Sequence, residues 1–176
     1  RGVDDDEVAV LQDAVVTVVV QVGMVLGRAD DDVVGELARA GIPSVSLKGA
    51  AIAAAHLASP GARHVSDLDL LVPRDRAEEA AAALAHEGPA MRPSFDHEGR
   101  LAGAIAHLRP FDTAGGISCE LHFQVPGCRG PELAERLLSG PRRAEVPGGA
   151  LRIPAPSDCA AVAAIHAYEG HGGEAR

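Results

Sequence analysis

The stretch Ser66-Asp67-Leu68-Asp69-Leu70-Leu71-Val72 is the part of this chain that most constrains its fold. Side chains alternate along a strand, so Asp67 and Asp69 would share one face, with Cα atoms roughly 7 Å apart. Aspartate is depleted in strands, and two carboxylates this close repel each other unless a cation lies between them. Magnesium takes oxygen ligands and commonly bridges carboxylates to substrate phosphates. The stretch therefore predicts a metal-binding strand, with a solvated acidic strand end as the alternative.

Lys48 and Gly49 lie between a predicted strand at residues 44–47 and an alanine-rich helix at residues 50–57. A glycine at this place lets backbone amides approach a ligand closely, and the start of a helix attracts anions. Lys48 adds a full positive charge. The pair is compatible with an anion-binding turn, although a glycine between a strand and a helix more often marks a plain turn.

Residues 117–125 alternate almost perfectly between apolar and polar side chains, which predicts a strand. Glu120 and His122 fall on its polar face, and Ile117, Cys119, Leu121, Phe123 and Val125 fall on the other. If this strand lies beside the Asp67 strand, Glu120 brings a third carboxylate to the metal region. An ordinary exposed strand residue is the alternative for Glu120. The other histidines, His107 among them, follow no ligand spacing and are interpreted as surface or core residues.

The rest of the chain predicts helices and short strands in alternation. We expect helices at residues 4–28, from 30 to an end at Gly41, at 75–86, after Pro131 and from 156 onward, and weaker strands at 102–108 and on both sides of 147–149. This order predicts an α/β or α+β fold, a mixed β-sheet packed against helices. We expect one domain at residues 1–154, followed at 155–176 by the start of a truncated C-terminal helical segment.

The composition excludes several classes of protein. The 176 residues carry a formal net charge of -9, and Lys48 is the only lysine, so strong non-specific binding of nucleic acid is not expected. The apolar stretch 8–26 is interrupted by Asp13 and other polar residues, which argues against a membrane span. Three widely spaced cysteines without a CxxC pair indicate free thiols in a reducing cytoplasm.

Taken together, these pieces resemble the nucleotidyltransferase superfamily of the DNA polymerase beta type. More closely, they are similar to its bacterial family of uncharacterised nucleotidyltransferases. The resemblance covers about residues 30–168 and rests on Gly41-Ile42-Pro43, Leu47-Lys48-Gly49-Ala50-Ala51, Pro60-Gly61-Ala62-Arg63, residues 66–72, Glu120-Leu121-His122-Phe123 and Pro156-Ser157. The wider superfamily has Gly-Ser at the phosphate turn where this chain has Lys48-Gly49, and family members tend to have tryptophan at the position of Phe123.

The resemblance implies a role for each matching residue. Asp67, Asp69 and Glu120 would be the catalytic carboxylates and would hold Mg²⁺ or Mn²⁺. His122 would hydrogen-bond to the metal site or the substrate. The nucleotide would contact four residues: Lys48, Gly49, Arg63 and Ser66.

The activity implied is a magnesium-dependent transfer of a nucleoside monophosphate from a nucleoside triphosphate to an unidentified acceptor. A small molecule or a protein is favoured as the acceptor over RNA, because the chain is acidic. The alternatives are a catalytically inactive nucleotide-binding domain of the same fold and a metal-dependent phosphohydrolase.

Overall fold

The computed structural model describes residues 33–55, 67–84, 106–108, 110–112, 118–128, 130–146 and 149–170. The helices and strands of these residues are, in chain order, α2 (Val33–Arg39), β1 (Val45–Ser46), α3 (Lys48–Ala55), β2 (Asp67–Leu71), the 3-10 helix η1 (Arg74–Arg76), α4 (Ala77–Leu84), β3 (Phe111–Asp112), β4 (Ser118–His122), α5 (Glu132–Ser139), β5 (Arg142–Val146), β6 (Gly149–Ile153) and α6 (Pro156–Gly170).

Four strands form the central sheet, in the spatial order β1-β2-β4-β3. β2 and β4 run parallel, with Asp69 opposite Glu120, whereas β1 and β3 are antiparallel to their neighbours. β5 and β6 pair with each other as a separate antiparallel hairpin. The predicted α+β fold, a mixed sheet packed against helices, is confirmed.

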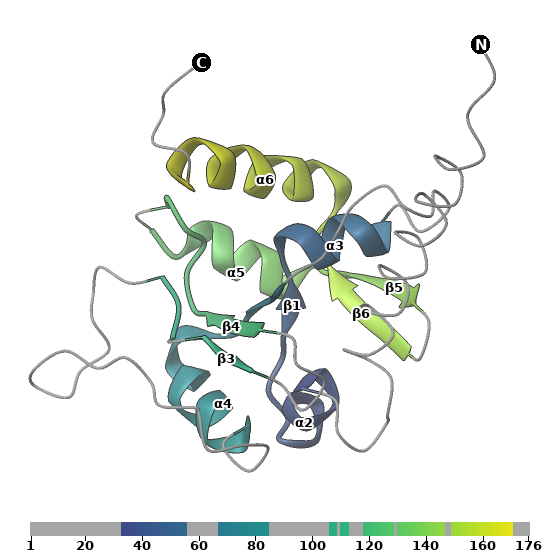
Figure 1. Ribbon diagram of the computed structural model, residues 1–176, viewed down its shortest axis with the longest axis vertical. Coiled ribbons are helices and arrows are strands. Elements are labelled where there is room, and N and C mark those ends of the chain that lie inside the picture. Colours follow the sequence, from purple (N-terminus) through teal and green to yellow (C-terminus); the bar gives the residue numbers. More distant parts are fainter. Residues whose placement is uncertain are drawn as a thin grey trace, which may run out of the picture.

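The two faces of the sheet are covered by different helices. Figure 1 shows α5 and α6 on one side of the sheet and α2 and α4 on the other. Leu70 of β2 and Leu121 of β4 belong to a core cluster that includes residues of α2 and α4. Leu71, one residue further along β2, packs instead with Leu137 of α5 and Val162 of α6. Because both faces are covered, β2 is a nearly buried strand, and a charged side chain on it needs a partner.

Gly41 ends α2 as the sequence predicts. Its φ of 66° is in the left-handed region that glycine adopts readily. The N–H of Gly41 donates to the carbonyl of Ala38, and the N–H of Ile42 donates to the carbonyl of Leu37, at 3.0 and 2.8 Å. This pairing is a Schellman motif, and the buried Ile42 and Leu37 supply the apolar contact that accompanies it.

The strand predicted at residues 117–125 is shorter in the structure, because the chain leaves the sheet after His122. The N–H groups of Phe123 and Gln124 both donate to the carbonyl of Ala106. Val125 consequently packs in the cluster with α5 and α6, whereas Phe123 stays in the cluster of the opposite face. The prediction that these two residues share a face was wrong, since the alternation holds only while the strand remains regular.

The other predicted elements agree with the structure in kind and differ at their ends. The predicted helix at 75–86 consists of η1 and α4, with the alanines and Leu84 of α4 buried as expected. The helix predicted from residue 50 begins at Lys48. The helix predicted at 4–28, the start of the next one and residues 102–105 lie outside the described residues. No helix in the described ranges is both long and apolar enough to cross a membrane.

Candidate metal centre

The parallel pairing of β2 and β4 creates a compact group of potential metal ligands. Asp69 and Glu120 lie directly opposite each other, so their side chains emerge on the same face of the sheet. His122 shares that face, two residues further along β4. One ligand atom from each of these three residues lies within 4.8 Å of the other two. Asp69 is 1% exposed and Glu120 is half-buried, so the group is closed on the Asp69 side and accessible on the Glu120 side.

His122 is fully buried and bridges the two carboxylates. Its Nε2 atom is 2.7 Å from Oδ1 of Asp69 and 3.3 Å from Oε2 of Glu120. Burial alone would lower the pKa of His122, but the contacts with both carboxylates outweigh it and raise the pKa above the usual value. The Nδ1 atom of His122 has no hydrogen-bond partner within the described part of the chain. His122 is thus held by the carboxylates through one ring nitrogen.

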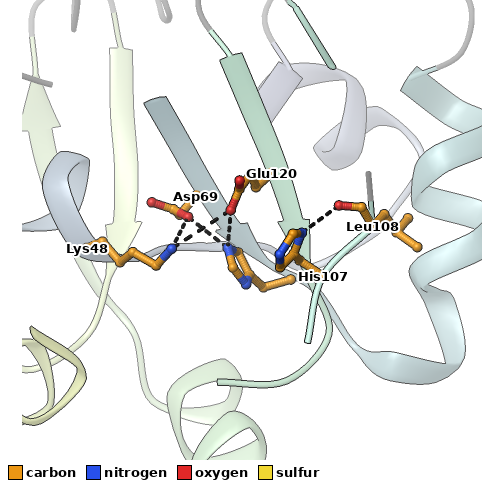
Figure 2. Close-up of polar contacts among 6 residues, drawn as sticks. Lys48, Asp69, His107, Leu108 and Glu120 are labelled. Carbon is orange, nitrogen blue, oxygen red and sulfur yellow. Dashed lines mark hydrogen bonds and ion pairs between the residues drawn. The ribbon is translucent and has the colours of Figure 1, made fainter. Parts of the chain in front are cut away.

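Lys48 supplies a second positive charge to the same carboxylates. Its Nζ atom lies 2.7 Å from Oδ1 of Asp69 and 3.9 Å from Oε2 of Glu120. Figure 2 shows the Lys48, Asp69 and Glu120 side chains pointing toward one another. The backbone of Lys48 has a φ of 46°, and Lys48 is the only non-glycine residue with a positive φ in the described ranges. A lysine in the left-handed region carries strain, which persists only where the surrounding structure enforces it.

Both carboxylates are stabilised in their ionised forms. Burial would raise the pKa of Asp69, but hydrogen bonds with His122 and Lys48 outweigh it and lower the pKa below the ordinary value. The pKa of Glu120 is also lowered, mainly by the hydrogen bond with His122 and further by the nearby charge of His107. At neutral pH, the centre therefore presents two carboxylate anions to a cation.

Of the remaining predicted site residues, the structure describes Asp67 and Gly49. Asp67 begins β2 opposite Ser118 and is half-buried; the group of three ligands described above does not include it. Gly49 follows Lys48 in the first turn of α3 and is buried. Arg63 and Ser66 lie outside the described residues.

Sequence reasoning missed the contribution of His107. The ring centroids of His107 and His122 are 5.1 Å apart, and an isolated antiparallel bridge joins the two residues. The His107 side chain contacts the carbonyl of Leu108 through Nδ1, at 2.7 Å. The sequence predicted a strand at residues 102–108. Pairing of this strand with β4 would have placed His107 beside His122, but that pairing was not predicted. Spacing along one element could not reveal a contact between two elements.

The donor set fits a divalent cation. Two carboxylate oxygens suit Mg²⁺ and Mn²⁺, and an imidazole nitrogen is more typical of transition metals. His122 would offer Nε2, the ring nitrogen that faces both carboxylates. Asp69, Glu120 and His122 would thus hold a cation between β2 and β4, with room for its remaining ligands on the half-exposed Glu120 side.

A cavity of about 710 Å³ lies where β2 and β4 end. It is lined by residues that directly follow these strands, including Pro73, Arg74, Phe123 and Gln124, and by Pro131, Ala134 and Leu138 around α5. The guanidinium carbon of Arg74 lies 5.0 Å from the centre of the Phe123 ring. Cavities of this size commonly bind small molecules.

An α+β fold whose neighbouring parallel strands present carboxylates able to hold a metal is consistent with a nucleotidyltransferase. The family model described as "Uncharacterised nucleotidyltransferase" matches residues 4–176, and the chain belongs to this family. The resemblance inferred from the motifs is therefore confirmed. No curated protein matches the chain.

Proposed function

We propose that this protein transfers a nucleoside monophosphate from a nucleoside triphosphate to an acceptor, with Mg²⁺ or Mn²⁺ bound at Asp69 and Glu120. The observation that carries the proposal is the register of β2 and β4, which sets these two carboxylates opposite each other beside His122. The chain's membership of a nucleotidyltransferase family supports it independently.

The carboxylates act as cation ligands in this proposal. A bound metal ion would supply positive charge against the triphosphate and align it for attack. The lowered pKa values of Asp69 and Glu120 support this role, because such carboxylates are weak proton acceptors and keep their charge at neutral pH. Asp69, held from the buried side, fixes the position of the cation, and the more exposed Glu120 faces the incoming substrate.

The proposal assigns the nucleotide to the open side of the centre. Lys48 and Gly49, at the start of α3, would contact the phosphates, since a lysine and free backbone amides both attract anions. Arg63 and Ser66 are assigned to the nucleotide from the family resemblance alone. Asp67 is assigned to the metal from that resemblance and from its position two residues before Asp69 on the same strand.

The acceptor is proposed to be a small molecule. The cavity beside the ends of β2 and β4 has a suitable size, and the net charge of -9 disfavours an RNA acceptor, since affinity for RNA depends largely on phosphate contacts.

Thermal unfolding with each of the four nucleoside triphosphates, in Mg²⁺ and then in EDTA, tests the binding part of this proposal. A ligand at about 100 times its dissociation constant adds about 2.7 kcal/mol of stability. For a chain of this size, that corresponds to a rise in Tm of about 5–11 °C. We expect such a rise for at least one nucleotide, dependent on Mg²⁺.

Glu120→Gln is the informative variant, and Glu145→Gln is its matched control, because Glu145 is an exposed residue of β5. The rise in Tm should disappear in Glu120→Gln and persist in Glu145→Gln. Failure of every nucleotide to shift Tm in the wild-type protein would refute the proposal. A shift without turnover would instead support the inactive nucleotide-binding domain, and release of free nucleoside monophosphate would indicate the phosphohydrolase.

A further inference from the structure

The ammonium group of Lys48 contacts Asp69 and lies close to Glu120, the two carboxylates that would hold a metal ion. It contacts the same Oδ1 atom of Asp69 that His122 approaches, at 2.7 Å in both cases, and it lies 3.9 Å from Glu120. The Lys48 side chain is only 12% exposed. A charge held this far from water is retained only when it is paired, so Asp69 and Lys48 neutralise each other while no metal is bound.

The backbone directs Lys48 into this position at an energetic cost. The N–H of Leu47 donates to the carbonyl of Asp69, at 2.9 Å, which ties the start of α3 to β2. Leu47 and Gly49 are both buried, so the residues on either side of Lys48 are fixed. The chain accepts a positive φ at Lys48 itself, although the neighbouring Gly49 would adopt that conformation without strain. Such strain tends to occur at functional positions.

We propose that Lys48 is an exchangeable counter-ion: an incoming Mg²⁺ displaces its ammonium group from Asp69, and the released group then binds the triphosphate. This inference deepens the proposed function and rests on it. His122 remains on the carboxylates or becomes a ligand, whereas Lys48 has a flexible stem of four carbons with which to move.

The exchange couples the binding of metal and nucleotide. Mg²⁺ alone must compete with an ammonium group that is already in place, so it binds weakly. Mg²⁺ together with a triphosphate gives the displaced ammonium a new anionic partner, so the two bind cooperatively. Removal of Lys48 should strengthen the binding of metal alone, because no ammonium group then competes for Asp69. It should weaken the binding of the metal–triphosphate complex, because the phosphates lose a cationic partner.

Isothermal titration of Lys48→Met with Mg²⁺ alone, and then with the Mg²⁺ complex of inorganic tripolyphosphate, tests this coupling. We expect Lys48→Met to bind Mg²⁺ alone at least about tenfold more tightly than the wild-type protein and to bind the complex at least about tenfold more weakly, within the usual range of coupling. Arg143→Met is the matched control, since it removes a positive charge from an exposed ion pair with Glu145 on β5. It should change neither affinity.

A measurement on the wild-type protein does not depend on whether Lys48→Met folds. Lys48 is the only lysine, so protein labelled with ¹³C-lysine gives a single side-chain Cε resonance. This resonance should shift when Mg²⁺ alone saturates the protein, and shift again when tripolyphosphate is added.

The outcomes separate the two proposals. If Mg²⁺ binds to the wild-type protein but the lysine resonance does not move, or if Lys48→Met binds Mg²⁺ no more tightly, the exchange is refuted and the proposed metal site stands. If neither the wild-type protein nor Lys48→Met binds Mg²⁺, the proposed function fails as well.

Discussion

Lys48→Met should destabilise the metal-free protein by an amount that depends on pH. The substitution keeps an unbranched side chain of similar length and removes the ammonium group from Oδ1 of Asp69. Asp69 is 1% exposed, so its carboxylate cannot turn to water for a new partner. Among the described residues, the carboxylate then keeps the hydrogen bond with His122.

The size of the effect follows from the geometry. A charge separation of 2.7 Å corresponds to an attraction of about 6 kcal/mol at an effective dielectric constant of about 20. Desolvation cancels part of it, and removal of one partner from a buried pair typically costs about 3–5 kcal/mol. His122 remains on the same oxygen, so we expect about 2–4 kcal/mol at about pH 7.

Protonation of Asp69 limits the penalty for leaving its carboxylate unpaired. At about 1.4 kcal/mol per pH unit above an ordinary pKa of about 3.9, neutralising the carboxyl costs about 4 kcal/mol at about pH 7 and about 1.5 kcal/mol at about pH 5. The destabilisation by Lys48→Met should therefore decrease as the pH falls. In Lys48→Met combined with Asp69→Asn, no charge is left unpaired, so the double variant should be more stable than Lys48→Met.

Urea denaturation in EDTA, followed by far-UV circular dichroism because the chain has no Trp, measures these differences at both pH values. Arg143→Met, whose ion pair is exposed, should change stability by no more than about 0.5 kcal/mol. A coupling energy between Lys48 and Asp69 below about 0.5 kcal/mol would refute the reasoning. An equal loss of stability in Lys48→Met at both pH values would also refute it.

Two further predictions concern pH and the end of α2. The raised pKa of His122 gives stability that is complete below its unfolded value of about 6.5 and is lost as the pH rises through the folded value. Urea denaturation of the metal-free protein should therefore show stability declining above about pH 6.5, and an equal decline in His122→Asn would contradict this origin. Gly41→Ala should cost about 1–2 kcal/mol, because an alanine at a positive φ is strained although the space is open. Gly140→Ala, at a negative φ with ordinary contacts, is its control in the same assay, and equal costs would exclude strain as the cause.

The shared polar face of Asp69 and Glu120 is the part of the centre that the sequence could predict. Alternation along residues 66–72 and 117–125 puts Asp69 and Glu120 on polar faces, and family resemblance suggests that the two strands are neighbours. The register that sets Asp69, and not Asp67, opposite Glu120 does not follow from these two facts, because a shift by two residues keeps the same side chains on the same face. Alternation failed at Val125, because the chain bends toward Ala106 after His122 and hydrogen bonds from Phe123 and Gln124 to Ala106 replace the regular ladder.

The positions of Lys48 and His107 beside the carboxylates were harder to predict, because they depend on turn geometry and on contacts between elements. Lys48 has a positive φ, which propensities assign to glycine and not to lysine. His107 reaches the centre through a single bridge to His122. Neither feature leaves a periodic pattern in the sequence. Lys48 was therefore predicted to contact only the phosphates, and His107 was interpreted as a surface or core residue.

Lys48 and His122 lie beside Asp69 and Glu120, so the two carboxylates have positively charged partners within the protein itself. From the sequence, Asp67 and Asp69 on one buried strand need a cation between them, because they repel each other. In the structure, Lys48 and His122 already compensate Asp69 and Glu120, so repulsion by itself no longer requires a metal. The case for one rests on the register that sets Asp69 opposite Glu120 and on the asymmetry of the centre: the Asp69 side chain is 1% exposed, whereas the Glu120 side chain is 23% exposed. Exposure of one carboxylate to solvent weakens the attraction within an ion pair. An ion pair with a purely structural role therefore gains nothing from that exposure. A centre that exchanges one cation for another needs that open side.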